Sequence, residues 1–198
     1  MSEGTDTNAH VGDLLTFATG PESQVVELRP ARTTSRAGGA PGTRFGLRRG
    51  TSATSWYDTG RRLEATDPPA AAAAYERALA ACPSLADAHN NLGRLHTAQG
   101  ASAAAEGCFR LAICADPSIS LYWFNLGVVV DEQGRHAEAI AAYERAIEID
   151  PAAADAHYNL ARLLDVIGRR TGDAATIWRA VRLLVRYRVL ARNRVGIR

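Results

Sequence analysis

The chain has 198 residues, of which 46% are hydrophobic and 22% charged, with a formal net charge of +2 at pH 7. These values are ordinary for a soluble protein that buries an apolar core. No apolar run approaches the roughly 20 residues that cross a bilayer, so a membrane span is not expected.

The first part of the chain, residues 1–51, shows no sustained helical period. It combines a Gly-rich stretch at residues 38–42 with scattered Ser, Thr and Arg, and its one short apolar run is at residues 25–28. This composition predicts a disordered or irregular arm. Residues 1–10 contain no basic residue and no apolar segment follows them, so a secretory signal is not expected and a cytoplasmic location is predicted.

From about residue 53 onward, several kinds of residue recur every 34 positions. An aromatic or branched residue, an Ala and a Pro mark each repeat, and a Gly or Ala precedes the aromatic residue by about 16 positions. The four sets are Tyr75, Phe109, Tyr143 and Ile177; Ala78, Ala112, Ala146 and Ala180; Pro83, Pro117 and Pro151; and Gly60, Gly93, Gly127 and Ala161. Gly60 precedes Gly93 by 33 positions, which indicates that one residue is missing at the turn around Asp67.

Each repeat predicts two helices that pack against each other. The small residue lets the second helix approach closely, the large residue fills the space between the helices, and the Pro ends the second helix. Gly100, Gly134 and Gly168 are expected to end the first helices in the left-handed conformation. The predicted helices are 53–65 and 70–81, 86–99 and 102–115, 120–133 and 136–149, and 154–167 and 173–192.

This pattern resembles the tetratricopeptide repeat family. The third unit carries the resemblance most fully, through Trp123, Leu126, Gly127, Ala139, Tyr143, Ala146 and Pro151, and the second through Leu92, Gly93, Ala105, Phe109, Ala112 and Pro117. The first unit has Thr59 where Leu is usual, and the fourth has Ala161 for Gly and Asp173 for Ala. The resemblance covers about residues 53–187 and implies an all-α, right-handed α-solenoid of three and a half to four antiparallel helix pairs. The domains expected are the arm at 1–51, the array at 52–187 (units about 53–85, 86–119, 120–153 and 154–187) and a basic extension at 188–198.

The resemblance also implies a concave groove lined by the first helix of each pair, which would bind an extended peptide or partner protein. Asn91, Asn125 and Asn159 lie in register two residues before the small residue, and a primary amide can pair with both polar groups of a peptide backbone. Either these amides form a peptide-holding ladder or they are solvated residues common at this position. The further groove candidates are Asp58, Asn90, Phe124, Tyr158, Arg94, Arg162, Asp131 and Asp165. Only Arg94 and Arg162 could clamp a carboxylate, so binding of a chaperone tail is not favoured.

The C-terminal end is strongly basic. Residues 169–198 hold nine arginines and one acid, whereas residues 51–168 hold eight arginines and fifteen acids, and the chain has no lysine. An apolar stripe from Ile177 to Tyr187 predicts a packed capping helix that ends near Tyr187. The arginines proposed as a basic tail are Arg179, Arg182, Arg186, Arg188, Arg192 and Arg194. Three interpretations stand: a solvated cap surface, which we favour, docking to an acidic surface, or contact with nucleic acid or an anionic membrane.

No enzyme is predicted, because the sequence lacks a phosphate loop, a nucleophile motif and a paired-carboxylate motif. His89 and His157 take the repeat positions of Trp56 and Trp123, which favours packed histidines over metal ligands. Three cysteines without a zinc or disulfide spacing predict small packed residues, and no cofactor is expected. Two alternatives to a peptide-binding scaffold remain: a regulatory adaptor that contacts nucleic acid or an acidic partner through the Arg-rich C-terminus, and a subunit that self-assembles through an uncapped end.

Overall fold

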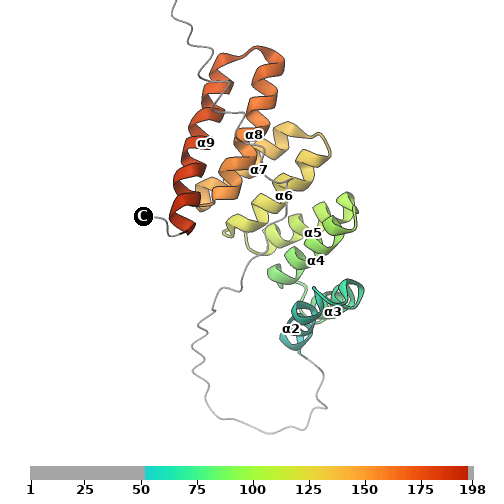
Figure 1. Ribbon diagram of the computed structural model, residues 1–198. Coiled ribbons are helices and arrows are strands. Elements are labelled where there is room, and N and C mark those ends of the chain that lie inside the picture. Colours follow the sequence, from blue (N-terminus) through green and yellow to red (C-terminus); the bar gives the residue numbers. More distant parts are fainter. Residues whose placement is uncertain (1–51, 196–198) are drawn as a thin grey trace, which may run out of the picture. The chain divides into compact units, whose positions relative to one another are not determined.

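The computed structural model describes residues 52–195, with side chains up to residue 193, and the predicted arm at 1–51 lies outside the described residues. This part of the chain is all helical, with no strand, and its eight helices form four antiparallel pairs (Figure 1). The predicted all-α fold in helix pairs is thereby confirmed. The chain divides into two compact units at Asp116–Pro117. None of the helices in residues 52–195 is both long and apolar enough to cross a bilayer.

The first unit contains the helices α2 (Ala53–Leu63), α3 (Pro68–Ala81), α4 (Ala86–Ala98) and α5 (Ser102–Ala115). Local chemistry sets where α2 and α3 begin. The Ser52 hydroxyl accepts a hydrogen bond from the Ser55 amide at 3.3 Å, and the Asp67 carboxylate accepts one from the Ala70 amide at 3.0 Å. Helix α3 begins two residues earlier than predicted, because the first turn of a helix tolerates proline.

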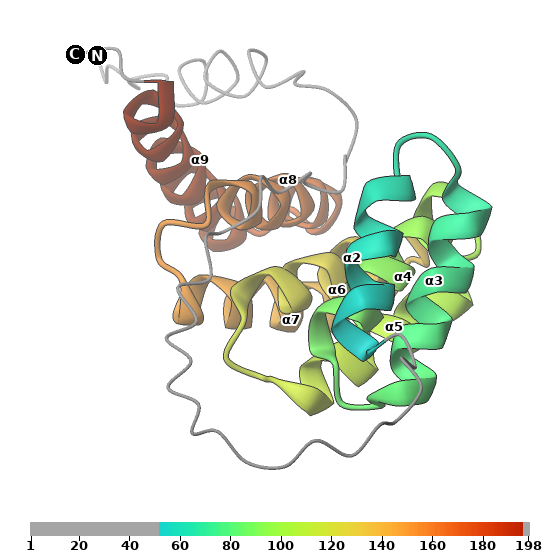
Figure 2. The same cartoon turned by 90° about the horizontal axis from the view of Figure 1, so that it is seen from below.

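The second unit contains α6 (Ser120–Glu132), α7 (His136–Ile149), α8 (Ala154–Thr171) and α9 (Ala174–Val195). In both views α8 lies beside α9 (Figure 1 and Figure 2). Helix α9 continues beyond Tyr187, so the predicted boundary at 187/188 falls inside it. Leu190 and Ala191 are half-buried, because they follow Tyr187 by three and four positions and extend its face of the helix.

The small residues of the repeat permit close packing within the first three pairs, as predicted. A Cβ atom built on Gly60 would lie 2.6 Å from the Tyr75 ring, and one on Gly127 would lie 2.6 Å from the Tyr143 ring. Gly93 meets Phe109 in the same way, at 2.7 Å. All three aromatic rings are buried. Any larger residue at these glycines would push the paired helices apart.

Two of the three glycines predicted to end the first helix of a pair in the left-handed conformation do so. Gly100 and Gly134 adopt left-handed backbone, with φ of 72° and 76°. The prediction is wrong at Gly168, which lies inside α8, and Gly172 takes the left-handed role with φ of 71°. The helix continues past Gly168 because Arg169 and Arg170 favour helix and a second glycine follows four positions later.

The cysteines are free thiols, but they are not all packed as expected. Cys82 and Cys108 are half-buried, whereas Cys114 is exposed. Burial, and to a smaller extent Glu76, raises the pKa of the Cys108 thiol, so this group stays protonated near neutral pH.

Candidate peptide-binding faces of the two units

In the first unit, the predicted groove residues come from the first helix of each pair. Asp58 on α2 is exposed, Asn91 and Arg94 on α4 are half-buried, and Asn90 is only 3% exposed. The Asn90 amide nitrogen donates to the Asn91 amide oxygen at 3.3 Å. The first unit therefore brings Asn91 and Arg94 together near the surface, with Asn90 bonded to Asn91 beneath them.

Asn91 is the centre of a polar cluster that joins three helices. Its amide nitrogen donates to the hydroxyl oxygens of Tyr57 at 3.4 Å and Tyr75 at 3.3 Å. The Tyr75 hydroxyl donates to the Glu64 carboxylate, whose other oxygen lies 3.5 Å from the Arg94 guanidinium. We call Tyr57, Glu64, Tyr75, Asn91 and Arg94 the tyrosine–asparagine cluster. The Asn91 amide is thus not an isolated solvated group, and a bound peptide would exchange some of these bonds.

The protonation of the cluster suits hydrogen bonding to a neutral ligand. Burial, and then the hydrogen bond to Glu64, raises the pKa of Tyr75 well above its usual value, and burial also raises the pKa of Tyr57. Both phenols therefore remain O–H donors at neutral pH. The Arg94 side chain is 19% exposed and its buried Nε has no hydrogen-bond partner, so the guanidinium does not use all its donors within the unit.

Sequence reasoning missed Tyr57, Glu64 and the role of the Tyr75 hydroxyl. Tyr57 occupies in the first repeat the place that Asn90, Phe124 and Tyr158 hold in the others, one residue before the groove position. Extending that register to the first repeat identifies Tyr57. The Glu64 contact has no such signal, because it depends on how α2 ends.

A ladder of peptide-binding amides requires the asparagine side chains to be open to solvent, and those of the second unit are not. Asn125 is fully buried and Asn159 is 4% exposed. Phe124, a predicted groove residue, is also 4% exposed, and its ring centre lies 6.0 Å from that of Tyr143. Helix α6 is buried without interruption from Phe124 to Val130, so a polar residue within that run is buried with its neighbours.

Tyr158, the other aromatic candidate, is half-buried against the last helix. Its ring centre lies 5.1 Å from that of Tyr187 on α9. A tilted pair of rings at this separation contributes to packing. Tyr158 therefore helps to hold α9 on α8, and only part of its surface is accessible to a ligand.

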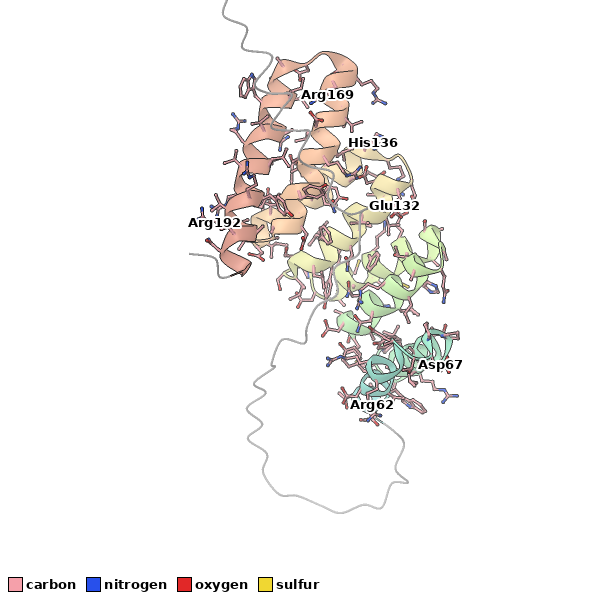
Figure 3. The ribbon with its side chains drawn as sticks, in the orientation of Figure 1. Arg62, Asp67, Glu132, His136, Arg169 and Arg192 are labelled. Atoms are coloured by element: carbon pink, nitrogen blue, oxygen red, sulfur yellow. The ribbon has the colours of Figure 1, made fainter. Side chains whose placement is uncertain are left out.

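The charged groove candidates of the second unit are joined in ion pairs. Asp131, whose side chain is 8% exposed, accepts from Arg162 on α8 at 2.6 Å and contacts the His136 ring nitrogen at 3.2 Å. Asp165 pairs with Arg169 at 2.8 Å. Figure 3 labels His136 and Glu132 where α6 meets α7, and Arg169 near the end of α8. Arg162 and Arg169 keep 43% and 52% of their side chains exposed, so both are accessible cations of this group.

The basic-tail arginines divide into one that packs and several that project. Arg179 donates to Glu144 of α7. Arg182, Arg186, Arg188 and Arg192 are exposed, and none of them forms an ion pair with a described residue. Figure 3 shows Arg192 on the side of α9 away from α8. Arg194 belongs to α9, but its side chain lies outside the described residues.

The histidines at the repeat's tryptophan position are structural. The ring nitrogens of His89 and His157 lie 2.9 Å and 3.1 Å from the carbonyl oxygens of the prolines six residues earlier. The Trp123 ring N–H donates to Pro117 in the same way, at 2.9 Å. Within residues 52–195 no group of His, Cys, Asp and Glu side chains has the arrangement of a metal site.

Comparison with known proteins places these units among helical repeats. A family model described as tetratricopeptide repeat matches residues 61–118, and a second, described as TPR repeat, matches residues 132–164. No curated protein matches the chain by sequence.

Solved structures share the fold at low sequence identity. A crystal structure of MamA superposes with a TM-score of 0.64 and 20% identity, over 73% of this chain and 81% of that one. MamA from Desulfovibrio magneticus RS-1 gives 0.60 and 19%, over 72% and 77%. The first TPR of Spaghetti (RPAP3), bound to the HSP90 peptide SRMEEVD, gives 0.57 and 19%, over 59% of this chain and 94% of that one.

Proposed function

Because this chain belongs to the tetratricopeptide repeat family, we propose that it is a protein-interaction scaffold whose first unit binds an extended peptide segment at the tyrosine–asparagine cluster. The observation that carries the proposal is the cluster itself. Amide, phenol and guanidinium groups from α2, α3 and α4 meet at a half-buried surface, where the Arg94 side chain is 19% exposed.

The chemistry of the cluster favours contact with the peptide main chain. Asn91 and the two phenols offer both donors and acceptors, and each exchanged hydrogen bond contributes roughly 1 kcal/mol net. Affinity from a few such bonds is modest, so side chains of the peptide must supply the rest. The neighbour that holds the peptide SRMEEVD supports peptide binding by this kind of fold.

The charge of the cluster argues against a strongly acidic peptide. Arg94 is the only cation in it, and Glu64 lies 3.5 Å away. A peptide carboxylate at Arg94 would therefore meet a guanidinium that is already partly neutralised, with the Arg61 guanidinium 5.9 Å from the Tyr57 ring centre at the edge of the cluster. A peptide of mixed or neutral character fits better than one with several acids at its end.

The test is an immobilised array of extended peptides with acidic, basic, neutral and apolar members, followed by fluorescence anisotropy with the best binder. Asn91→Ala combined with Arg94→Ala should weaken that peptide at least tenfold, since two or more bonds are lost. Arg145→Ala is the matched control, because this exposed arginine on α7 pairs only with Glu148 among the described residues. Unchanged affinity in a double variant with wild-type helicity, or no bound peptide on the array, would contradict the proposal.

A further inference from the structure

The face of α9 that does not pack in the unit carries large apolar side chains. Trp178, Val185 and Val189 are 53%, 54% and 48% exposed. Together with Arg182 and Arg192 they form a row with steps of four, three, four and three residues. We call these five residues the outer seam of α9. The row spans about 21 Å of helix at 1.5 Å per residue.

The repeat does not account for this apolar row. The positions equivalent to Trp178 in the three preceding pairs hold Glu76, Arg110 and Glu144, all charged. Helix α9 packs in the unit through other residues: Ala180 is fully buried, Val181 is 9% exposed and Tyr187 contacts Tyr158. Trp178 therefore stands, facing solvent, where the other repeats have a charged residue. Packing among the described residues does not require a tryptophan there.

The spacing of the outer seam indicates what kind of surface would cover it. Alternating steps of three and four residues are the spacing of the core positions in two-helix coiled coils, where residues of one helix insert between residues of the other. Any one-sided stripe on a helix has these steps, but the apolar face of an amphipathic helix is usually wider, whereas this row is one residue wide and includes two arginines. The seam therefore favours a single amphipathic helix as its occupant.

The charge of α9 indicates which helix would fit. The helix has six arginines and no acid, and Arg186 and Arg188 flank the seam. Charges at flanking positions select the partner in coiled coils, and arginine pairs well with carboxylates in a two-pronged geometry. A second copy of α9 would bring only like charges together, which disfavours a symmetric contact through this face.

We infer that the outer seam of α9 docks an amphipathic helix of a partner protein whose apolar stripe is flanked by Glu or Asp. Trp178, at the N-terminal end of the seam, is its largest apolar anchor, and Arg182, Arg186, Arg188 and Arg192 pair with the partner's carboxylates. This surface is independent of the tyrosine–asparagine cluster, so the chain has two separate protein-binding sites.

The probe is a fluorescent synthetic peptide of three heptads with Leu at both core positions and Glu at the flanking ones. A matched peptide carries Lys in place of Glu. Fluorescence anisotropy with the full chain should show binding of the Glu peptide and not of the Lys peptide, with affinity that falls as salt is added. Trp178→Ala combined with Val185→Ala should weaken the Glu peptide by roughly 30-fold, because the pair removes the aromatic anchor and the central valine of the seam.

Charge exchange separates this proposal from a general loss of structure. The combined Arg182→Glu, Arg186→Glu and Arg192→Glu variant should lose the Glu peptide and bind the Lys peptide. Leu111→Ala removes a similarly exposed apolar side chain from α5 and should change nothing. The Asn91→Ala and Arg94→Ala variant should also bind the Glu peptide normally, so failure of one site is distinguishable from failure of the other.

Four results would overturn the inference. These are equal binding of the two peptides, no binding of either, unchanged affinity in the Trp178→Ala and Val185→Ala variant, and binding to vesicles of phosphatidylcholine and phosphatidylglycerol without binding to the Glu peptide. The last result would assign the arginines and Trp178 to a lipid surface instead.

Discussion

The third and fourth helix pairs belong to the same unit and follow the same 34-residue repeat, yet their helices meet at different places. In α6–α7, Gly127 faces the Tyr143 ring. In α8–α9, Ala161 holds the position of Gly127, and the residue equivalent to Tyr143, Ile177, lies against Gly168, where a Cβ atom would be 2.7 Å from its Cγ1 atom. The point of close approach has moved two helical turns along α8.

The same shift is visible in the turn that joins the two helices. The left-handed glycine is Gly134 in the third pair and Gly172 in the fourth, 38 residues later rather than 34. Helix α8 gains about one turn at the expense of the start of α9. The 34-residue period of the packing residues is kept, so the repeat tolerates a change in helix length when a second glycine is available to end the helix.

The largest expected change in the free energy of unfolding comes from replacing the large residue that fills the space between the two helices of a pair. Tyr143 is 1% exposed, so Tyr143→Ala should destabilise α6–α7 by about 4 kcal/mol. Ile177 is half-buried, and Ile177→Ala should cost α8–α9 about 2 kcal/mol. Urea unfolding gives the totals, and amide hydrogen exchange of peptides from each pair locates the loss. Equal costs at the two positions would mean that the fourth pair packs as tightly as the third.

The next effect tests the displaced turn. Gly134→Ala and Gly172→Ala should each cost about 1–2 kcal/mol, because an alanine in left-handed backbone is strained. Gly172→Asn should recover part of the loss, since Asn tolerates this conformation better. Gly168→Asn should be costly, because its added Cβ would contact Ile177 of α9 and the backbone oxygen of Asp173 just before that helix. The opposite pattern, with Asn tolerated at 168 and Ala at 172, would show that α8 ends at Gly168, as the sequence predicts.

The smallest effect concerns a charge that the fourth pair lacks. Glu132 corresponds to Val166, and burial, then Asp131, raises the pKa of Glu132. A carboxyl whose pKa is raised on folding destabilises the folded state above that pKa, and the penalty disappears as pH falls through it toward the unfolded value. Glu132→Gln should therefore stabilise the protein at neutral pH by roughly 0.5 kcal/mol or less, since the group is largely exposed and screened. Thermal unfolding of both forms at pH 7 and near pH 4 measures the difference, which should shrink at the lower pH.

Much of the fold could be predicted because its determinants are local. Apolar residues at helical spacing, the closing prolines and the small residues facing large ones specify the helices and their pairing. Gly168 was the exception, because two glycines four positions apart compete to end α8 and packing against α9 decides between them. Asp173 departs from the family pattern, which has Ala there, and its carboxylate accepts a hydrogen bond from the Ala175 amide at 3.0 Å near the start of α9.

The candidate site was less predictable, because exposure depends on neighbours distant in sequence. Asn91 and Asn125 hold the same repeat position, yet Asn91 is half-buried and bonded to two tyrosines, whereas Asn125 is fully buried. The register of the repeat gives the position of each amide along its helix. It does not give how far that amide is buried, because burial depends on the side chains that surround it.

The ring-to-proline hydrogen bonds at His89, Trp123 and His157 have a consequence for how such repeats diverge. The position requires a flat ring with an N–H at the right reach, and both imidazole and indole provide one. Phenylalanine would fill the space but leave the proline carbonyl without its donor. Histidine and tryptophan, which substitution tables treat as dissimilar, are therefore interchangeable here, and a search that scores them as equivalent at this position would detect more distant copies of the repeat.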